Sequence, residues 1–243
     1  MHQKNWPNFS KELISNVSKI LSSGKINYTT GKYGKLFEKK FSEFTGNKYS
    51  IAVCNGTAAL EVAIKSLNLP KNSEIIVPAR SFFSSAACIV NTGHKPVFSD
   101  VDLITQNISL EFIKKKITKN TKAIICVHLA GLPCDMNKIK KLVFKKNIKI
   151  IEDCSQAHGA SINNKQVGTF GDVSTWSFCN DKIISTLGEG GMISTNNKKI
   201  YNFCKMYINH GSVSKNLKNS EKFLYNKDYF GTNLRITEIQ SFA

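Results

Sequence analysis

The sequence predicts an α/β protein in which helices cover both faces of a mostly parallel sheet. From Tyr49 onward, short apolar runs such as "SIAV", "EIIV" and "KAIICVHL" alternate with helical segments. This alternation is typical of βαβ units, whose buried parallel strands are apolar throughout. The length of 243 residues and the hydrophobic content of 41% suffice for one large domain. Ligands bind such sheets at the carboxyl ends of the strands, so the residues just past each strand are the candidate site residues.

Two amphipathic helices precede this alternation. Ser10 can cap the first, whose apolar residues at 13, 14, 17, 20 and 21 fall on one face before Gly24 ends it. The second carries four aromatic residues at helical spacing and ends at Gly46. We expect these helices to occupy residues 1 to about 46 of a single domain that spans residues 1–243.

The remaining elements continue the same alternation. A capped helix can start at Ser109, "MNKIKKLVFKK" predicts a further helix, and "IKIIED" predicts a strand. Side chains from Val173 to Ser177 alternate as in a strand. The final residues, "NLRITEIQSFA", predict a helix that is still running at the last residue, so we expect a further C-terminal part.

The composition favours a cytoplasmic protein without nucleic-acid or membrane partners. The formal net charge of +17 comes from scattered lysines, with arginine only at Arg80 and Arg235, and not from a basic patch with interleaved aromatics. A compositional bias of the source genome explains this charge as well as an acidic partner does. The seven cysteines form no CxxC pair and no zinc-type spacing with histidine, so we expect reduced thiols and no metal site. No apolar run reaches the roughly 18 to 20 residues of a membrane span, and the first residues lack the apolar core of a secretory signal.

The first candidate site residues follow the strand "SIAV". Asn55, Gly56 and Thr57 form a glycine turn that opens a helix, which exposes backbone N–H groups and a hydroxyl to an anion such as phosphate. A turn with a simple helix N-cap is the alternative interpretation.

Two charged residues follow later strands. Asp153 ends the apolar run "IIED", where a buried carboxylate requires a cationic or donor partner; a helix cap or a structural ion pair is the alternative. Lys182 lies five residues past Ser177 and next to a glycine cluster, where backbone can approach a ligand closely. Desolvation and neighbouring cations can lower the pKa of such a lysine and make its amine a nucleophile that forms a Schiff base. A solvated surface charge is the alternative for Lys182.

An aromatic residue, Phe82, follows the strand that Pro78 closes. It can stack on a flat ring or fill the core. Together, the phosphate-binding turn, the aromatic residue, the buried acid and the nucleophilic lysine are the parts needed to hold pyridoxal phosphate.

Eight blocks of sequence, in this order, carry a resemblance to a known family. They are "NGTAAL", "EIIVPARSFFSSAA", "PVFSDVD", "AIICVHLAGLPCDM", "IIEDCSQAHGA", "VGTFGD", "WSFCNDKIISTLGEGGMIST" and "FGTNLRITEIQ". From about Gly24 to the last residue, the chain resembles the DegT/StrS family of sugar aminotransferases. The resemblance implies the large domain of a fold-type I pyridoxal-phosphate-dependent transferase, with three α/β/α layers and a mostly parallel mixed sheet. It also implies that a smaller C-terminal domain is largely absent.

The resemblance implies roles for residues around the cofactor ring. Lys182, in the block "SFCNDK", is expected to form the Schiff base with pyridoxal phosphate. Asp153 is expected to pair with the pyridine nitrogen and keep it protonated, Gln156 to contact the phenolic oxygen, and Phe82 to stack on the ring.

At the phosphate, the resemblance implies contacts from Thr57, Ala58 and Ser177. Asn233, in "FGTNLR", is expected to reach the phosphate of the neighbouring subunit, which implies a homodimer with shared active sites. His158 and Glu189 lie in matching blocks without an assigned role, although Glu189 can buttress the glycine turn.

Members of this family usually transfer an amino group from glutamate to a keto group on a nucleotide-linked sugar, giving amino sugars for polysaccharide, glycan or antibiotic assembly. The resemblance therefore implies an aminotransferase with these substrates. Dehydratases of the family carry histidine where this chain has Lys182, so lysine favours transamination. A dehydratase, and a cofactor-binding relative that is catalytically impaired or regulatory, are the alternatives.

Overall fold

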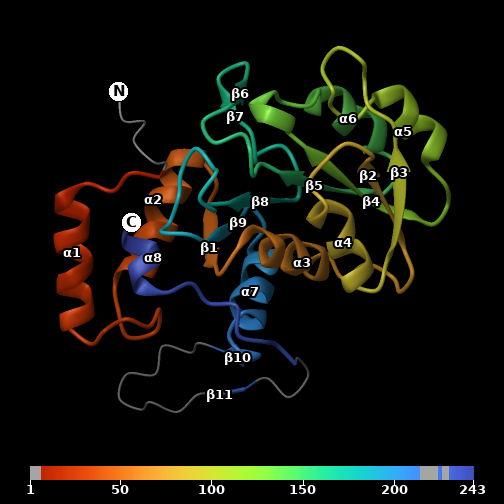
Figure 1. Cartoon of the computed structure of the whole chain (residues 1–243). Helices are drawn as coiled ribbons and strands as arrows, with labels where there is room; N and C mark the ends of the chain where they lie inside the picture. The colour runs from red at the N-terminus through yellow and green to blue at the C-terminus, as the bar shows by residue number, and fades with distance from the viewer. Residues whose placement is uncertain (1–6, 214–223, 226–229) are drawn as a thin grey trace, which may run out of the picture.

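A seven-stranded sheet lies between two layers of helices in the computed structural model, which describes residues 7–213, 224–225 and 230–243 (Figure 1). The strand order is β1-β9-β8-β5-β4-β2-β3. The strands are β1 (Tyr49–Val53), β2 (Glu74–Pro78), β3 (Lys95–Ser99), β4 (Thr121–Val127), β5 (Lys149–Asp153), β8 (Val173–Ser177) and β9 (Gly191–Thr195). Two small hairpins stand apart from this sheet, and they are formed by β6 (Ser161–Ile162) with β7 (Lys165–Gln166) and by β10 (Ser212–Val213) with β11 (Leu224–Tyr225).

The sheet is parallel except at one strand. Neighbouring strands from β8 to β3 pair in parallel, whereas β9 runs antiparallel to both β1 and β8. The prediction of a mostly parallel mixed sheet is therefore confirmed, although residue alternation alone did not identify β9 as a strand. Because β1, β2, β5 and β8 point the same way, their carboxyl ends meet at one edge of the sheet.

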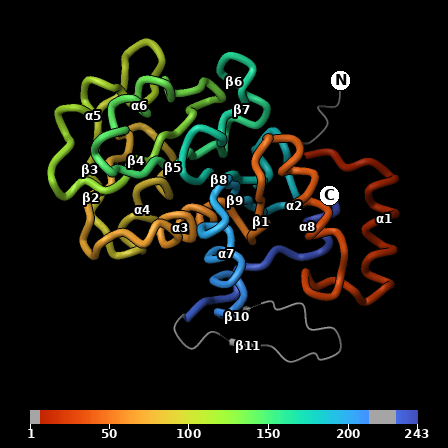
Figure 2. The backbone as a smooth tube through the Cα atoms, turned by 180° about the vertical axis from the view of Figure 1, so that it is seen from behind, coloured from red at the N-terminus to blue at the C-terminus, as the bar shows by residue number. Residues whose placement is uncertain are grey.

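Most of the helices form the outer layers (Figures 1 and 2). The helices are α1 (Lys11–Ser22), α2 (Tyr33–Thr45), α3 (Gly56–Ser66), α4 (Ser84–Asn91), α5 (Leu110–Lys116), α6 (Met136–Val143), α7 (Lys198–Tyr207) and α8 (Glu238–Phe242), with a 3₁₀ turn η1 (Leu129–Gly131). Helix α1 lies to one side of the molecule and contacts α8 (Figures 1 and 2). Successive strand residues face opposite layers: Ile75 and Val77 pack in the cluster that contains α3, α4 and α7, and Ile76 packs with α5 and α6. This alternation produces the three predicted layers.

Aromatic packing joins α2 to the centre of the sheet. Phe41 of α2 is buried, and its ring centroid lies 5.1 Å from Trp176 of β8 and 5.4 Å from Phe178, edge-on in both cases. Such contacts combine a large buried apolar area with favourable ring geometry. The helix ends at Gly46, whose positive φ of 77° closes it as predicted.

The first helix is capped as expected but packs only lightly. The Ser10 side chain accepts a hydrogen bond from the Leu13 amide. Of the predicted apolar face, Ile20 is buried, whereas Ile14 is 57% and Leu21 is 54% exposed. The amphipathic pattern thus predicts the helix correctly, while only one of the five apolar residues of its face is buried and two are exposed.

Two local predictions are wrong in detail. Ser109 precedes α5, but its side chain makes no capping hydrogen bond. The helix predicted for the last residues begins only at Glu238, because Thr237 and Gln240 form a capping box that starts α8 there. The residues before it are extended, and Leu234 O accepts a hydrogen bond from the amide of Cys54, 2.9 Å away, just past β1.

All seven cysteines are free thiols, as predicted. No helix among the described residues combines the length and the apolar character that crossing a membrane requires.

Candidate active site

Most of the predicted site residues follow the carboxyl ends of β1, β2, β5 and β8, which meet at one edge of the sheet. Two contacts bring the separate loops together. The Ser85 hydroxyl at the start of α4 donates to Asp153 Oδ2 at the end of β5, 3.1 Å away. At the other contact, a Cβ added to Gly56 would lie 2.8 Å from the Cβ of Ser177, so the end of β8 touches the start of α3.

The turn after β1 forms a tightly packed helix N-terminus. The Asn55 side chain caps α3 by accepting from the Ala58 amide at 2.8 Å, which confirms the N-cap interpretation. Thr57 is half-buried on the first turn, and the neighbouring Gly56 packs against the Ser177 side chain. A Cβ at Gly191 would lie 2.3 Å from the Asn55 carbonyl oxygen, so β9 can approach this turn only with glycine there. The positive end of the α3 dipole and the Ser177 side chain therefore meet in one place.

Asp153 is a buried carboxylate held by donors from two segments. It is 5% exposed, and Oδ1 accepts from the Ser155 amide at 3.1 Å while Oδ2 accepts from Ser85. No lysine, arginine or histidine forms an ion pair with it among the described residues, so the structural ion-pair alternative is not supported. A carboxylate offers about four acceptor positions, which leaves capacity for a further donor. Sequence reasoning missed Ser85, because nothing in "SSAA" distinguishes one serine from the next.

Phe82 stands outside the core. It lies just before α4 and is 70% exposed, so the interpretation of this residue as a core side chain is wrong. The neighbouring Phe83 is 80% exposed. Since exposing a large aromatic side chain forgoes its burial energy, an exposed Phe82 beside the Asp153 loop suits a ring that packs against a bound molecule.

Lys182 lies on the loop after β8 and is not a solvated surface charge. Its side chain is only 19% exposed, and Nζ lies 3.3 Å from Asp181 Oδ2. Its backbone amide donates to the Cys179 carbonyl at 3.0 Å, which fixes the turn that carries it. The loop returns to β9 through the hydrogen bond from the Thr186 amide to the Phe178 carbonyl.

Gln156 and Glu189 hold neighbouring loops. Gln156 Oε1 accepts from the Ala130 amide at 2.7 Å, and Ala130 adopts a positive φ of 50° in η1. The Glu189 carbonyl accepts from the Thr186 hydroxyl at 3.0 Å and from the Gln240 side chain at 2.6 Å. Glu189 thus supports the glycine turn through its backbone.

Asn233 is exposed on the extended segment beside the end of β1. It pairs with Asn209 in an isolated antiparallel bridge, and its side-chain oxygen accepts from the Arg235 amide at 3.4 Å. The structure leaves Asn233 at the surface, apart from the contacts that join the other site residues.

His158 is buried close to the lysine loop. It is 8% exposed, and its ring centroid lies 5.4 Å from Trp176 and 5.5 Å from Phe178. Neither ring nitrogen makes a hydrogen bond of normal geometry in the described structure, although the Ser177 backbone lies close enough to act on the ring. Burial, and then the positive charge of Lys182, lower the pKa of His158 to about 4, against a smaller opposing contribution from the Ser177 backbone. The imidazole is therefore neutral at pH 7.

Glu152, next to Asp153 but on the other face of the sheet, is fully occupied by donors. Its side chain is completely buried and accepts from His128 Nε2 at 3.1 Å and from three backbone amides of the loop after β7. Those amides belong to Gly168, Phe170 and Gly171. His128 Nδ1 accepts from the Cys134 amide, so Nε2 carries the proton. His128, Glu152 and Cys154 lie close enough together to hold a metal ion. Both Glu152 oxygens and both His128 nitrogens, however, already make hydrogen bonds within the protein, so this cluster is structural.

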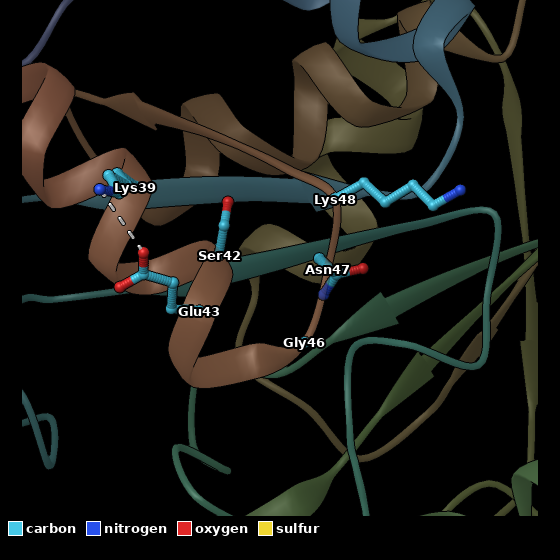
Figure 3. A pocket seen from close by; sticks show the side chains of 6 residues that line it. All are labelled: Lys39, Ser42, Glu43, Gly46, Asn47 and Lys48. Carbon is cyan, nitrogen blue, oxygen red and sulfur yellow. Dashed lines mark ion pairs between the residues drawn. The ribbon is translucent and has the colours of Figure 1, made fainter.

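A shallow cavity of about 390 Å³ lies at the opposite end of β1 from this site (Figure 3). It is lined by Lys39, Ser42, Glu43, Gly46, Asn47 and Lys48. These residues end α2 and precede β1, whereas Asn55 and Thr57 follow β1. The cavity is therefore separate from the candidate active site.

Comparisons with known proteins agree with this arrangement. The GDP-perosamine synthase of Escherichia coli O157:H7 is 41% identical over 223 residues, covering 92% of this chain and 59% of the relative. The solved aminotransferase of Psychrobacter cryohalolentis is 43% identical with a TM-score of 0.94, over 98% of this chain and 61% of that one. An E. coli GDP-4-keto-6-deoxy-D-mannose-3-dehydratase solved with bound hydrated PLP is 30% identical with a TM-score of 0.86, over 99% of this chain and 66% of that one.

The chain thus spans about three fifths of the length of the curated relatives that it matches. Within that length the match is continuous, because the family model of the DegT/DnrJ/EryC1/StrS aminotransferases covers residues 7–242. The blocks of the resemblance, the mixed sheet and the polar strand ends all fall inside this range. The chain belongs to the DegT/DnrJ/EryC1/StrS aminotransferase family.

Proposed function

We propose that this chain is the cofactor-binding large domain of a pyridoxal-phosphate-dependent aminotransferase that acts on a nucleotide-linked keto sugar. The observation that carries the proposal is a largely buried lysine near a buried carboxylate. Lys182 lies on the loop after β8, and the neighbouring strand β5 ends in Asp153, which is buried and accepts few hydrogen bonds. Family membership supports it, as does the PLP in the related E. coli structure.

The residues present fit this cofactor. The contacts of Gly56 with Ser177 and of Gly191 with Asn55 leave a helix N-terminus with hydroxyls, which suits a phosphate. Asp153 retains acceptor capacity for a protonated ring nitrogen. Exposed Phe82 supplies an aromatic face for a planar ring.

Each residue has a defined task at the ring. When bound, pyridoxal phosphate supplies an electrophilic aldehyde carbon and an electron-withdrawing ring. Lys182 Nζ would supply the nucleophile for that carbon and a base able to move a proton at the substrate carbon. The Asp153 carboxylate, oriented by Ser85, holds the proton on the ring nitrogen. Gln156, whose Oε1 accepts from the Ala130 amide, would orient the phenolic oxygen through its side-chain NH2 group.

The proposal extends to the phosphate contacts and to the oligomer. Thr57, Ala58 and Ser177 would hold the phosphate at the start of α3. The Ala58 amide now donates to the Asn55 side chain, so the phosphate would compete with Asn55 for this donor. Exposed Asn233 would serve the phosphate of the neighbouring subunit, so the functional unit is a homodimer with shared active sites.

Glutamate is the proposed amino donor, and the acceptor is a keto group on a nucleotide-linked sugar for polysaccharide or glycan assembly. The relative named GDP-perosamine synthase supports this class of substrate. The net charge of +17 is compatible with an acceptor that carries two phosphate charges. Seven free thiols are compatible with a cytoplasmic site of action.

A dehydratase is the second candidate, because a solved GDP-4-keto-6-deoxy-D-mannose-3-dehydratase superposes with a TM-score of 0.86. Lys182 weighs against it, since the resemblance places histidine at this position in dehydratases.

An absorbance experiment tests the proposal. The purified chain with pyridoxal phosphate should develop a visible band that glutamate replaces with a near-ultraviolet band, and Lys182→Ala should abolish the visible band. Lys25→Ala, a matched change of an exposed lysine, should leave both bands intact. A wild-type chain without the band, or a band that survives Lys182→Ala, would contradict the proposal.

A further inference from the structure

His158 is a buried polar residue that the proposed function does not use. Both of its ring nitrogens are shielded from solvent and make no hydrogen bond of normal geometry, although the Ser177 backbone lies close enough to act on the ring, and the neighbouring Trp176 Nε1 is also buried without a hydrogen bond. Buried polar atoms without hydrogen bonds destabilise a fold, and an apolar ring of similar shape avoids that cost. Phenylalanine would fill the space between Trp176 and Phe178 equally well, so stability does not explain a histidine here.

The position of His158 connects it to the lysine. It lies in the turn after β5, two residues past Gln156, and packs on Phe178, from which the Lys182 loop departs. Among the described residues, Lys182 is the charged group whose field acts on the imidazole, and the packed rings of Trp176 and Phe178 carry no charge. The imidazole is neutral, so one of its nitrogens carries a proton that can face the Ser177 backbone and the other is a free acceptor.

We propose that His158 is a positioning residue for Lys182: with the cofactor bound, its unprotonated nitrogen accepts a hydrogen bond from the Lys182 side-chain nitrogen. This inference rests on the proposed function. The four-carbon stem of Lys182 rotates freely enough to leave the exposed carboxylate of Asp181, whose side chain is 72% exposed. The hydrogen bond stabilises the protonated form of the Lys182 nitrogen and sets its direction.

The test is a pH titration of the visible band of the cofactor-loaded chain, which reports protonation of the Lys182 nitrogen. His158→Phe keeps the aromatic packing and should lower the pH midpoint by about one unit, the size expected for one lost hydrogen bond to a charged group. His158→Asn and His158→Gln offer an acceptor near each ring position, and one of them should restore the midpoint at least in part. His94→Phe is the matched control, because His94 also has an unpartnered nitrogen but lies between α4 and β3; its midpoint should not move.

The outcomes separate this inference from the proposed function. Absence of any band in the wild type contradicts the function itself. A band whose midpoint is the same in His158→Phe overturns the inference alone, and a raised melting temperature in that variant would then make His158 a structural residue. Should the variants not fold, nitrogen-15 NMR of histidine-labelled wild type decides: cofactor loading should shift the acceptor nitrogen of His158, and an unchanged signal overturns the inference.

Discussion

Glu152 and Asp153, two adjacent buried residues at the end of β5, show that burial alone does not decide whether a carboxylate is structural or available to a ligand. Glu152 accepts four hydrogen bonds and has no capacity left, whereas Asp153, on the opposite face, accepts two. A saturated carboxylate organises the backbone around it, and an unsaturated one is available to a ligand. The difference lies in the partners, which come from distant segments.

Glu152→Gln should destabilise the fold strongly. The amide nitrogen of glutamine would face donors that the carboxylate now accepts, which leaves at least one of them unsatisfied in a buried site. We expect the free energy of unfolding, measured by urea denaturation, to fall by about 2 to 4 kcal/mol. The control Glu43→Gln removes an exposed carboxylate 3.9 Å from Lys39 and should cost less than about 0.5 kcal/mol. Equal effects of the two changes would refute the structural role of Glu152.

The lowered pKa of His158 predicts a pH dependence of stability. The unfolded chain binds a proton at His158 near pH 6.5, but the folded chain does so only near pH 4, so stability is complete above pH 6.5 and is lost as pH falls toward 4. Relative to His158→Phe, the wild type should lose up to about 3 kcal/mol across this window and nothing above pH 7. Urea unfolding of both proteins from pH 8 to 4.5 measures the difference, and a constant difference would contradict the assignment.

At the scale of elements, the last helix secures the start of α2. Glu238 is 1% exposed, and its carboxylate accepts from the amides of Tyr33 at 2.6 Å and Gly34 at 2.8 Å. A negative group at a helix N-terminus satisfies orphan amides and complements the helix dipole. The segment after Asn233 therefore orders the helix that packs Phe41 on the sheet.

Glu238→Ala should consequently destabilise α2, although it lies in α8. We expect the free energy of unfolding to fall by roughly 1 to 2 kcal/mol, and hydrogen exchange to speed up at the first turn of α2. Glu12→Ala, in the first turn of exposed α1, serves as the control and should change α2 exchange little. If exchange in α2 stayed unchanged in Glu238→Ala, the capping role would be excluded.

Several elements could be predicted from sequence because their signals are local. The apolar runs of β2 and β4 and the cap at Ser10 need no tertiary information. The strand β9 and the late start of α8 could not be predicted, because both depend on residues distant in the sequence. The strand β9 forms by pairing with β1 and β8, and the extended segment before α8 forms a hydrogen bond with the residue just past β1.

At the scale of the whole molecule, the site residues also divide into those with local sequence signals and those that depend on distant contacts. Asp153 and Lys182 could be proposed from sequence, because Asp153 is a charged residue at a predicted strand end and Lys182 follows another predicted strand beside a glycine cluster. Ser85 and His158 could not be given roles, because the contact of Ser85 with Asp153 and the buried ring of His158 arise only when the loops assemble.

A shared site between two subunits makes a testable prediction. Asn233→Ala alone should weaken pyridoxal phosphate binding about tenfold by removing one hydrogen bond to a charged group. When this variant is mixed and reassociated with Lys182→Ala, each mixed dimer should contain one complete site with wild-type affinity. Absorbance titration measures that affinity. No recovery in mixed dimers would show that Asn233 serves its own subunit or no site.

The central claim is that Lys182 is the nucleophile that bonds to the cofactor. The most direct measurement is borohydride reduction of the cofactor-loaded chain, followed by proteolysis and mass spectrometry. Our account predicts one stoichiometric pyridoxyl adduct on the peptide that contains Lys182, despite the many other lysines. An adduct spread over several lysines, or confined to one other than Lys182, would contradict it.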